Sequence, residues 1–169
     1  ASGEASQGNY SVTYEPATFT IGKKLATITV AAAEKTYGDT DPTFTGKVEG
    51  LVNETDLGTI AYSRTDAATD VNVGTYKDKL TATFTANDNY NVSVVPATFT
   101  IKQKPVTVAA DDNSKTFGEA DPTLTATVEG TLGEDKVEYS LARATGENVG
   151  TYTITASGDA SQGNYSVTY

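Results

Sequence analysis

The chain contains no cysteine, histidine, methionine or tryptophan among its 169 residues. Without cysteine it can form no disulfide, and without cysteine or histidine it lacks the usual ligands of structural zinc sites. The same absences exclude a cysteine nucleophile and histidine-based acid–base catalysis. No apolar run approaches the ~20 residues that a membrane-spanning helix needs. We therefore expect no enzyme activity, no catalytic or metal site, and no membrane insertion in this segment.

The chain is acidic, with 22 aspartate and glutamate residues against 12 lysine and arginine residues and a formal net charge of −10. These charges are spread along the sequence and form no block. Nucleic acids and anionic membranes attract clustered lysine and arginine, so neither is expected as a partner. The charge pattern instead predicts a well-solvated surface.

Two kinds of internal repeat run through the sequence. Residues 1–14 (ASGEASQGNYSVTY) and 156–169 (ASGDASQGNYSVTY) are identical at thirteen of fourteen positions. Residues 35–50 (KTYGDTDPTFTGKVEG) and 115–130 (KTFGEADPTLTATVEG) share ten of sixteen positions. The shorter pairs are NVGTY at 72–76 and 148–152, NYNVSV at 89–94 with NYSVTY at 164–169, and PATFTI at 16–21 and 96–101. Repetition at a period near 80 residues is typical of a tandem array.

Threonine and apolar residues alternate along most of the chain, as in ATFTI at 17–21 and TYTIT at 151–155. This period of two predicts β-strands with one buried face, and β-branched threonine suits the exposed face. Only residues 51–58, with Asn53 as a cap, and 131–136 are candidates for a short helical turn. The predicted core residues are Ile28, Val30, Phe44, Val48, Ile60, Tyr62, Tyr76, Phe84, Tyr90, Val92, Phe99, Ile101, Val106, Val108, Leu124, Val128, Val137, Tyr139, Tyr152, Ile154, Tyr165 and Val167.

The ordered set YGDTDP at 37–42, VEG at 48–50, NVGTY at 72–76 and PATFTI at 96–101 resembles the MBG domain in its YGX-type form. Residues 117–119 depart modestly, with FGE in place of YGD. The resemblance implies tandem repeats of bacterial surface proteins and adhesins. It also implies a small β-rich domain related to β-grasp folds and an extracellular location on the bacterial cell surface.

The repeat pattern divides the chain into three segments. Residues 1–23 are expected to be the C-terminal strand or strands of a preceding repeat. Residues 24–103 are expected to form one complete MBG-like repeat, and residues 104–169 a second that lacks its final strand. The expected fold class is mainly β, with two tandem small β domains. The family resemblance and the short turn after VEG imply that each is β-grasp-like with at most one short helical turn. Period-two patterning does not separate this class from an immunoglobulin-like sandwich, which remains the alternative. The short joint, stiffened by Pro105, predicts an end-to-end rod.

The tail has strand-like faces without a sheet of its own, and the second unit is expected to lack the strand that residues 16–21 would supply. The tail of one molecule would then complete the last unit of another, and such a head-to-tail contact builds a filament. The candidate strand-donor residues are Tyr10, Val12, Tyr14, Phe19 and Ile21. Alternatively, the chain is a window cut from a longer array. The duplication of 1–14 in 156–169 fits that alternative, because only residues 15–23 would be missing from the recipient.

The acidic pairs of the sequence are Asp39 with Asp41, Glu119 with Asp121, and Asp111 with Asp112. Calcium prefers such oxygen ligands, but an aspartate that precedes proline commonly makes a turn with its own backbone. No cofactor is therefore expected, and calcium is the alternative. Lys35 and Lys115 recur at the same repeat position, either as exposed loop residues or as donors for an internal Lys–Asn crosslink.

The expected function is a non-enzymatic structural repeat segment of a bacterial extracellular surface fibre or adhesin stalk. One alternative is the head-to-tail filament subunit described above. The other is a glycan- or mucin-binding module, in which aromatic rings stack on sugars. The tyrosines considered for such a platform are Tyr10, Tyr14, Tyr90, Tyr165 and Tyr169. The expected partners are neighbouring copies of the same repeat or chain, with host glycan or mucin as a further candidate.

Overall fold

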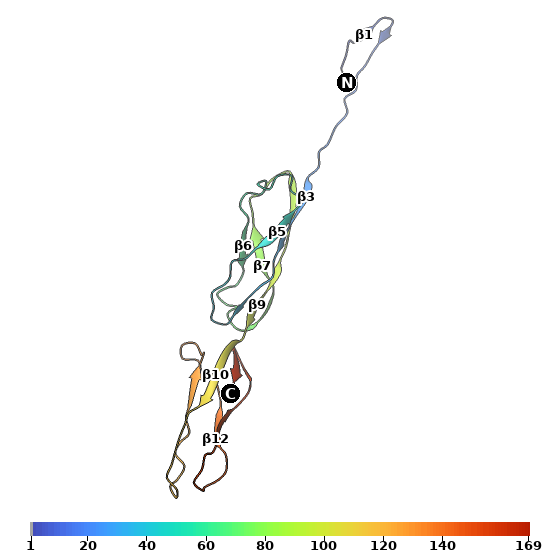
Figure 1. The fold of residues 1–169 in the computed structure, drawn as a ribbon. Coiled ribbons are helices and arrows are strands. Elements are labelled where there is room, and N and C mark those ends of the chain that lie inside the picture. Colours follow the sequence, from blue (N-terminus) through green and yellow to red (C-terminus); the bar gives the residue numbers. More distant parts are fainter. Residues whose placement is uncertain (1) are drawn as a thin grey trace.

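The computed structural model describes residues 2–169, and this part of the chain is all-β. Two β units lie end to end, and the N-terminal tail extends from the end of the first unit that is remote from the second (Figure 1). No helix is present in residues 2–169, and hence none long and apolar enough to cross a membrane. The predicted fold class, with two tandem β domains in a rod, is confirmed.

The first unit contains seven strands. They are β3 (Lys24–Val30), β4 (Ala33–Thr36), β5 (Gly46–Glu49), β6 (Ala61–Arg64), β7 (Gly74–Thr83), β8 (Tyr90–Val95) and β9 (Ala97–Lys102). They form one sheet in the order β5-β3-β8 and a second in the order β4-β9-β7-β6. The ladders β3–β8 and β4–β9 are parallel, and the others are antiparallel.

The second unit repeats part of this plan. Its strands are β10 (Lys104–Ala110), β11 (Ala126–Glu129), β12 (Ser140–Arg143), β13 (Ile154–Ser157), β14 (Ser161–Gln162) and β15 (Tyr165–Thr168). They form a sheet in the order β11-β10-β15-β14 and a two-stranded sheet of β12 and β13. The ladder β10–β15 is parallel, as β3–β8 is in the first unit. Immunoglobulin sandwiches are built from antiparallel sheets, so the parallel ladders argue against that alternative.

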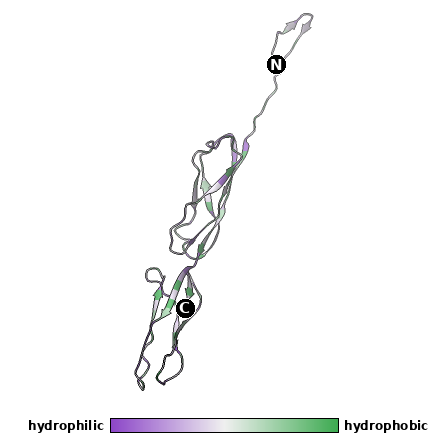
Figure 2. Ribbon diagram, viewed as in Figure 1, coloured by the Kyte–Doolittle hydropathy of each residue, from purple (hydrophilic) through white to green (hydrophobic). Residues whose placement is uncertain are grey.

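The alternating pattern places one face of each strand in a core. In β3, Ala26, Ile28 and Val30 are buried, as the period of two predicts. Figure 2 shows the apolar residues gathered on the strands of both units. The first core is built from Ile28, Val30, Leu57, Leu80, Ala82, Phe99 and Ile101. The second is built from Val106, Val108, Val137, Ala156, Tyr165 and Val167.

The core prediction was wrong at Tyr139, whose side chain is 37% exposed, and it omitted Leu57 and Leu80, which are fully buried. Leu57 lies within residues 51–58, the segment predicted as a helical turn. That segment instead forms two hydrogen-bonded turns, in which Asp56 N–H donates to Asn53 O and Gly58 N–H donates to Thr55 O. The Asp56 carboxylate accepts the backbone N–H of Asn53. The capping side chain of this turn is therefore that of Asp56 and not that of Asn53.

The tail begins with a small hairpin of β1 (Ser6–Gln7) and β2 (Tyr10–Ser11). Gly8 takes a positive φ of 64° at its turn, which glycine adopts without a steric penalty. Residues 12–23 belong to no strand.

Candidate functional site

The two units are joined by a very short connection. β9 ends at Lys102 and β10 begins at Lys104, so a single residue separates the last strand of one unit from the first strand of the next. Tyr37 of the first unit meets Tyr165 of the second edge to face, with ring centroids 5.6 Å apart and an interplanar angle of 85°. The core of one unit is thereby in contact with the core of the other.

Asn164 adds a polar contact across the same joint. Its Oδ1 accepts the backbone N–H of Val73 at 2.9 Å, and its Nδ2 donates to Asn72 Oδ1 at 3.0 Å. Its backbone carbonyl accepts the N–H of Lys104 at 2.9 Å. Asn164 therefore connects the first strand of the second unit to a loop of the first unit. Together with the contact between Tyr37 and Tyr165, it fixes the orientation of the two units.

Tyr165 is held in place by an aspartate. Its hydroxyl donates to Asp135 Oδ2 at 2.5 Å and accepts the Leu132 N–H at 3.0 Å, while the Tyr37 hydroxyl donates to the same carboxylate oxygen at 3.4 Å. Burial and the hydrogen bond to Asp135 raise the pKa of Tyr165 above its ordinary value. The phenol therefore stays neutral and keeps its role as a donor.

The first unit has the same arrangement at its opposite end. The Tyr90 hydroxyl donates to Asp56 Oδ2 at 2.5 Å and accepts the Val52 N–H at 2.8 Å. The hydrogen bond to Asp56 raises the pKa of Tyr90, and the hydrogen bond from Tyr90 lowers the pKa of Asp56. Val52 corresponds to Leu132 of the joint, and its side chain is 71% exposed.

An ion-pair cluster lies beside β9 in the first unit. Arg64 Nε is 2.7 Å and Nη2 is 3.1 Å from the carboxylate oxygens of Asp41, and Nη1 donates to the Asp70 carbonyl. Lys35 Nζ is 2.8 Å from Asp41. The Arg64 guanidinium also lies over the Phe99 ring, 4.5 Å from its centroid. Arg64 thus connects a nearly buried ion pair to the main aromatic side chain of the core.

The second unit repeats this cluster. Arg143 makes a bidentate contact with Asp121, at 3.0 and 3.2 Å, and its Nη1 donates to the Gly146 carbonyl at 2.7 Å. Lys115 Nζ is 2.6 Å from Asp121 and 2.5 Å from Glu147. The cluster is more open than its counterpart, since the Arg143 side chain is 19% exposed against 3% for Arg64.

Both clusters favour the ionised carboxylates. Burial alone would raise the pKa of Asp41, but hydrogen bonds and charge attraction from Arg64 and Lys35 outweigh burial and lower it. Hydrogen bonds from Lys115 and Arg143 lower the pKa of Asp121. The partners of Lys35 and Lys115 in residues 2–169 are these carboxylates and a backbone carbonyl, and no asparagine side chain is hydrogen-bonded to either lysine there.

The structure does not gather the predicted acidic pairs into a metal site. Asp41 and Asp121 contact lysine and arginine, the Asp111 carboxylate accepts the Thr127 hydroxyl, and Glu119 accepts a backbone N–H. In residues 2–169 no three acidic side chains lie close enough together to hold a metal ion.

The five tyrosines considered for sugar stacking do not share a surface. Tyr90 and Tyr165 are core residues with 6% and 4% exposure, whereas Tyr10 is 76% exposed on the tail hairpin. Of the candidate strand donors, Phe19 and Ile21 are 88% and 85% exposed. Tyr10, also a candidate donor, is exposed as stated, whereas the remaining two, Val12 and Tyr14, are only partly exposed.

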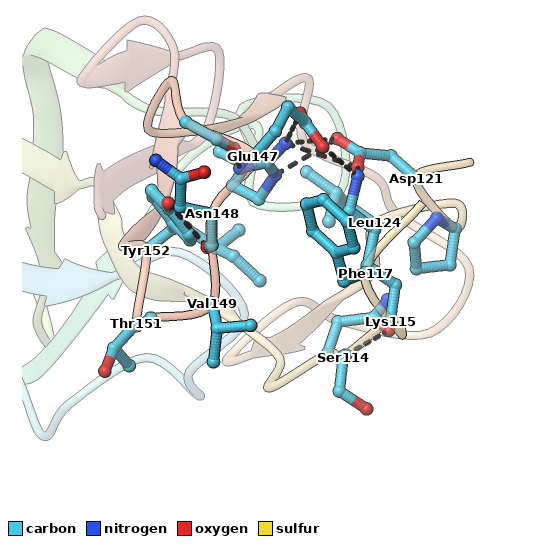
Figure 3. Close-up of a pocket in the computed structure, with 16 residues that line it drawn as sticks. Ser114, Lys115, Phe117, Asp121, Leu124, Glu147, Asn148, Val149, Thr151 and Tyr152 are labelled. Atoms are coloured by element: carbon cyan, nitrogen blue, oxygen red, sulfur yellow. Dashed lines mark hydrogen bonds and ion pairs between the residues drawn. The ribbon is translucent and has the colours of Figure 1, made fainter. Parts of the chain in front are cut away.

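A pocket of about 250 Å³ opens in the second unit between residues 113–115 and 150–152. Figure 3 shows Phe117, Leu124 and Tyr152 around it, with the ion pairs of Asp121 and Glu147 on one side. It therefore offers an apolar interior beside a charged rim.

Sequence reasoning missed the arginines and the joint asparagines. Arg64 and Arg143 are the two arginines of the chain, one in each unit at equivalent positions, and this was a usable signal. Asn72 lies within the repeated NVGTY block and Asn164 within the repeated NYSVTY block, but their contact across the joint depends on the packing of the units.

The chain was also compared with known proteins. No curated protein and no solved structure matches it. The family model of the MBG domain (YGX type) matches residues 26–100 and again residues 106–169, which together cover most of the chain. The chain therefore belongs to the MBG domain family of the YGX type, with two tandem members.

Proposed function

We propose that this chain is a non-enzymatic structural segment of a stalk or fibre on a bacterial cell surface, in which each repeat sets the orientation of the next. MBG repeats are a structural type of domain typical of surface proteins. The observation that carries the proposal is the joint, where Tyr37 contacts Tyr165 and Asn164 binds Val73 and Asn72. A segment that transmits position needs this kind of contact, and a binding module on a flexible linker does not.

The free energies expected for these contacts are consistent with a stiff joint. An edge-to-face aromatic pair contributes about 0.5–1.5 kcal/mol beyond its buried area, and each net hydrogen bond contributes about 1 kcal/mol. With one connecting residue, the chain entropy that opposes these contacts is small. The joint contacts therefore suffice to favour one orientation of the two units.

The absence of cysteine makes the test direct, because single cysteines can be placed without competing thiols. We would attach spin labels at exposed Lys77→Cys and Glu134→Cys and measure their distance distribution by electron spin resonance. A narrow distribution is expected, and it should broaden when Tyr37→Ala and Asn164→Ala are added. A broad distribution in the parent would contradict a stiff segment.

The surface location has its own test. Brief protease treatment of intact bacteria that carry the chain should release its peptides before those of a cytoplasmic marker. Release only after lysis would overturn the extracellular part of the proposal.

A further inference from the structure

The first unit is connected to the rest of the chain at both of its ends. Residues 1–23 precede it and residues 104–169 follow it. The chain enters at Lys24, the first residue of β3, and leaves at Lys102, the last residue of β9. β3 begins at the end of the unit near the tail, and β9 ends beside the second unit (Figure 1). Tension along the chain therefore acts on this unit between Lys24 and Lys102.

The strands through which the chain enters the unit are paired directly with those through which it leaves. β3 pairs with β8, from Lys24 opposite Tyr90 to Thr29 opposite Val95. β4, which follows β3, pairs along its whole length with β9, which follows β8. Both ladders are parallel, and they belong to the two different sheets of the unit. The entering and leaving segments therefore run side by side in the same direction through both sheets.

Backbone hydrogen bonds extend this pairing at its two ends. The Lys24 N–H donates to the Asn89 carbonyl at 2.8 Å, and the Tyr37 N–H donates to the Lys102 carbonyl at 2.9 Å. The pairing therefore begins where the chain enters the unit and ends where the chain leaves it.

This arrangement determines how tension acts on the ladders. Tension pulls β3 and β4 towards Lys24 and pulls β8 and β9 towards Lys102, so the two segments are drawn past each other along the strand direction. The hydrogen bonds of a ladder run between the strands and not along them. Sliding therefore strains all the bonds of a ladder together. A ladder that is pulled apart from one end loses its bonds one after another.

The core opposes the same sliding. β3 contributes Ile28 and Val30 to the first core, β9 contributes Phe99 and Ile101, and all four side chains are buried. A slip by one residue would turn each buried side chain of a strand to the opposite face. Because the interior is close-packed, such a slip has no intermediate position that keeps these contacts. The hydrogen bonds and the core therefore have to break together.

The second unit begins with the same pairing. β10 pairs in parallel with β15, and the Lys104 N–H donates to the Asn164 carbonyl at 2.9 Å, as the Lys24 N–H does to the Asn89 carbonyl. Asn89 and Asn164 both stand before a tyrosine in the repeated NY blocks. The parallel ladder at the entry is therefore a property of the repeat.

We infer that the paired segments 24–37 and 89–102 form a mechanical clamp, which makes the first unit resist unfolding when the chain is under tension. The proposed stalk function, on which this inference rests, is the setting in which such tension arises. The clamp goes beyond that function, because a stiff joint sets the orientation of the units without requiring resistance to force. Forced unfolding is governed by the rate of unfolding, so the clamp acts on the barrier to unfolding.

Force spectroscopy of single molecules of the full chain tests the clamp. The sequence has no cysteine, so a pair of introduced cysteines defines the direction of pulling. Handles at Gly22→Cys and Lys102→Cys load the clamp in shear and leave the second unit unloaded. Handles at Gly22→Cys and Asp88→Cys lie at the same end of the β3–β8 ladder and open it pair by pair. Gly22, Asp88 and Lys102 are exposed, so the fold should be unchanged.

The unfolding force should be severalfold higher in shear than in the peeling direction at the same pulling speed. Each shear event should release the chain between residues 22 and 102, which is roughly 260–290 Å before the length of the folded unit is subtracted. Equal forces in the two directions, or a lower force in shear, would overturn the inference.

A matched pair of variants separates the clamp from general stability. Thr27 in β3 lies inside the clamp and Thr81 in β7 lies outside it, and both are half-buried strand residues. Thr27→Gly and Thr81→Gly should both lower the midpoint of urea unfolding, because glycine weakens a strand interior. Thr27→Gly should also lower the shear force, whereas Thr81→Gly should leave it unchanged. An equal loss of force in the two variants would assign the resistance to general stability and overturn the clamp.

The clamp and the stalk function can fail separately. Equal forces in the two pulling directions would leave the narrow spin-label distribution expected for the joint in place. A broad spin-label distribution would contradict the stiff segment and would leave the ratio of the two unfolding forces unchanged.

Discussion

Tyr37 and Tyr165 lie in different repeats, and their rings meet edge to face with centroids 5.6 Å apart. Tyr37 packs against the buried residues of both cores, whereas Tyr165 is itself a core residue of the second unit. A single side chain from the first repeat thus completes the hydrophobic cluster of the second. Stability should therefore be coupled between the two repeats, as nearest-neighbour models of repeat proteins describe.

Replacement of Tyr37 should uncouple the units. We expect Tyr37→Ala to lower the free energy of unfolding of the second unit by about 2 kcal/mol, from the lost aromatic pair and its buried area. The matched control is Phe117→Ala, at the equivalent but exposed position, which should change it by less than about 0.5 kcal/mol. Urea unfolding, followed by separate probes in each unit, measures both. Equal effects of the two substitutions would contradict a coupling role.

Gly38 offers a second probe of the joint. Gly38 and Gly118 have positive φ values of 84° and 89°, so alanine introduces similar backbone strain of about 1–2 kcal/mol at either position. A Cβ at Gly38 would lie 2.1 Å from Leu132 Cδ1, whereas nothing lies within 4 Å of a Cβ at Gly118. Gly38→Ala should therefore broaden the inter-unit distance distribution measured by spin labels. Gly118→Ala should not, although both lower the melting temperature.

Arg64 should contribute more to stability than Arg143. Arg64→Ala leaves Asp41 with Lys35 alone and removes the cation over Phe99. We expect a loss of about 2–3 kcal/mol, at the low end for breaking a buried ion pair because Asp41 is partly exposed. Arg143→Ala should cost distinctly less, since its cluster is more open. Denaturant unfolding of both variants provides the comparison, and the reverse order would show that the clusters do not act as described.

Acid should destabilise the chain through its ion-pair clusters. The folded pKa values of Asp41 and Asp121 lie below the ordinary 3.8, and that of Glu147 lies below 4.5. Their contribution is therefore complete above those ordinary values and is lost as the pH falls through the folded pKa values. Asp41→Asn should lower stability at neutral pH and flatten its decline below pH 3.8. A decline of unchanged steepness in the variant would assign acid sensitivity to other groups.

Alkali should also destabilise the chain, through its buried tyrosines. The folded pKa values of Tyr165 and Tyr90 lie above the ordinary 10.0. The contribution of each is complete below that value and is lost as the pH rises through the folded pKa. Tyr165→Phe should lower stability at pH 7, because Asp135 and the Leu132 N–H lose their partner, and should reduce the alkaline decline. Absorbance titration of tyrosinate alongside unfolding measurements separates this from general base denaturation.

Most of the fold follows from local sequence patterns. Alternation of threonine with apolar residues identified inward positions such as Ile28, Phe99 and Val106, all of which are buried. Leu80 was not identified, although it lies four residues after Tyr76 and a strict period of two places both on the inward face. The charged Asp78 interrupts the apolar alternation between them, at the place where the ladder of β7 with β9 shifts register.

The joint between the units was beyond sequence reasoning for a different reason. The sequence places Asn72 and Asn164 in repeated blocks, yet the hydrogen bond between them joins residues 92 positions apart. Likewise, the exposure of Phe19 and the burial of Phe99 follow from the strands around them, because both stand in the same six residues.

The clearest division between local and tertiary control lies in the duplicated ends. Residues 6–11 and 161–166 have the same sequence and the same hairpin register, with Gln7 paired to Tyr10 and Gln162 paired to Tyr165. Turn chemistry at a positive-φ glycine determines this hairpin wherever it stands. Tyr10 is nevertheless 76% exposed and Tyr165 only 4%. β10 lies beside the second copy, and burial depends on a neighbouring strand that local sequence does not provide.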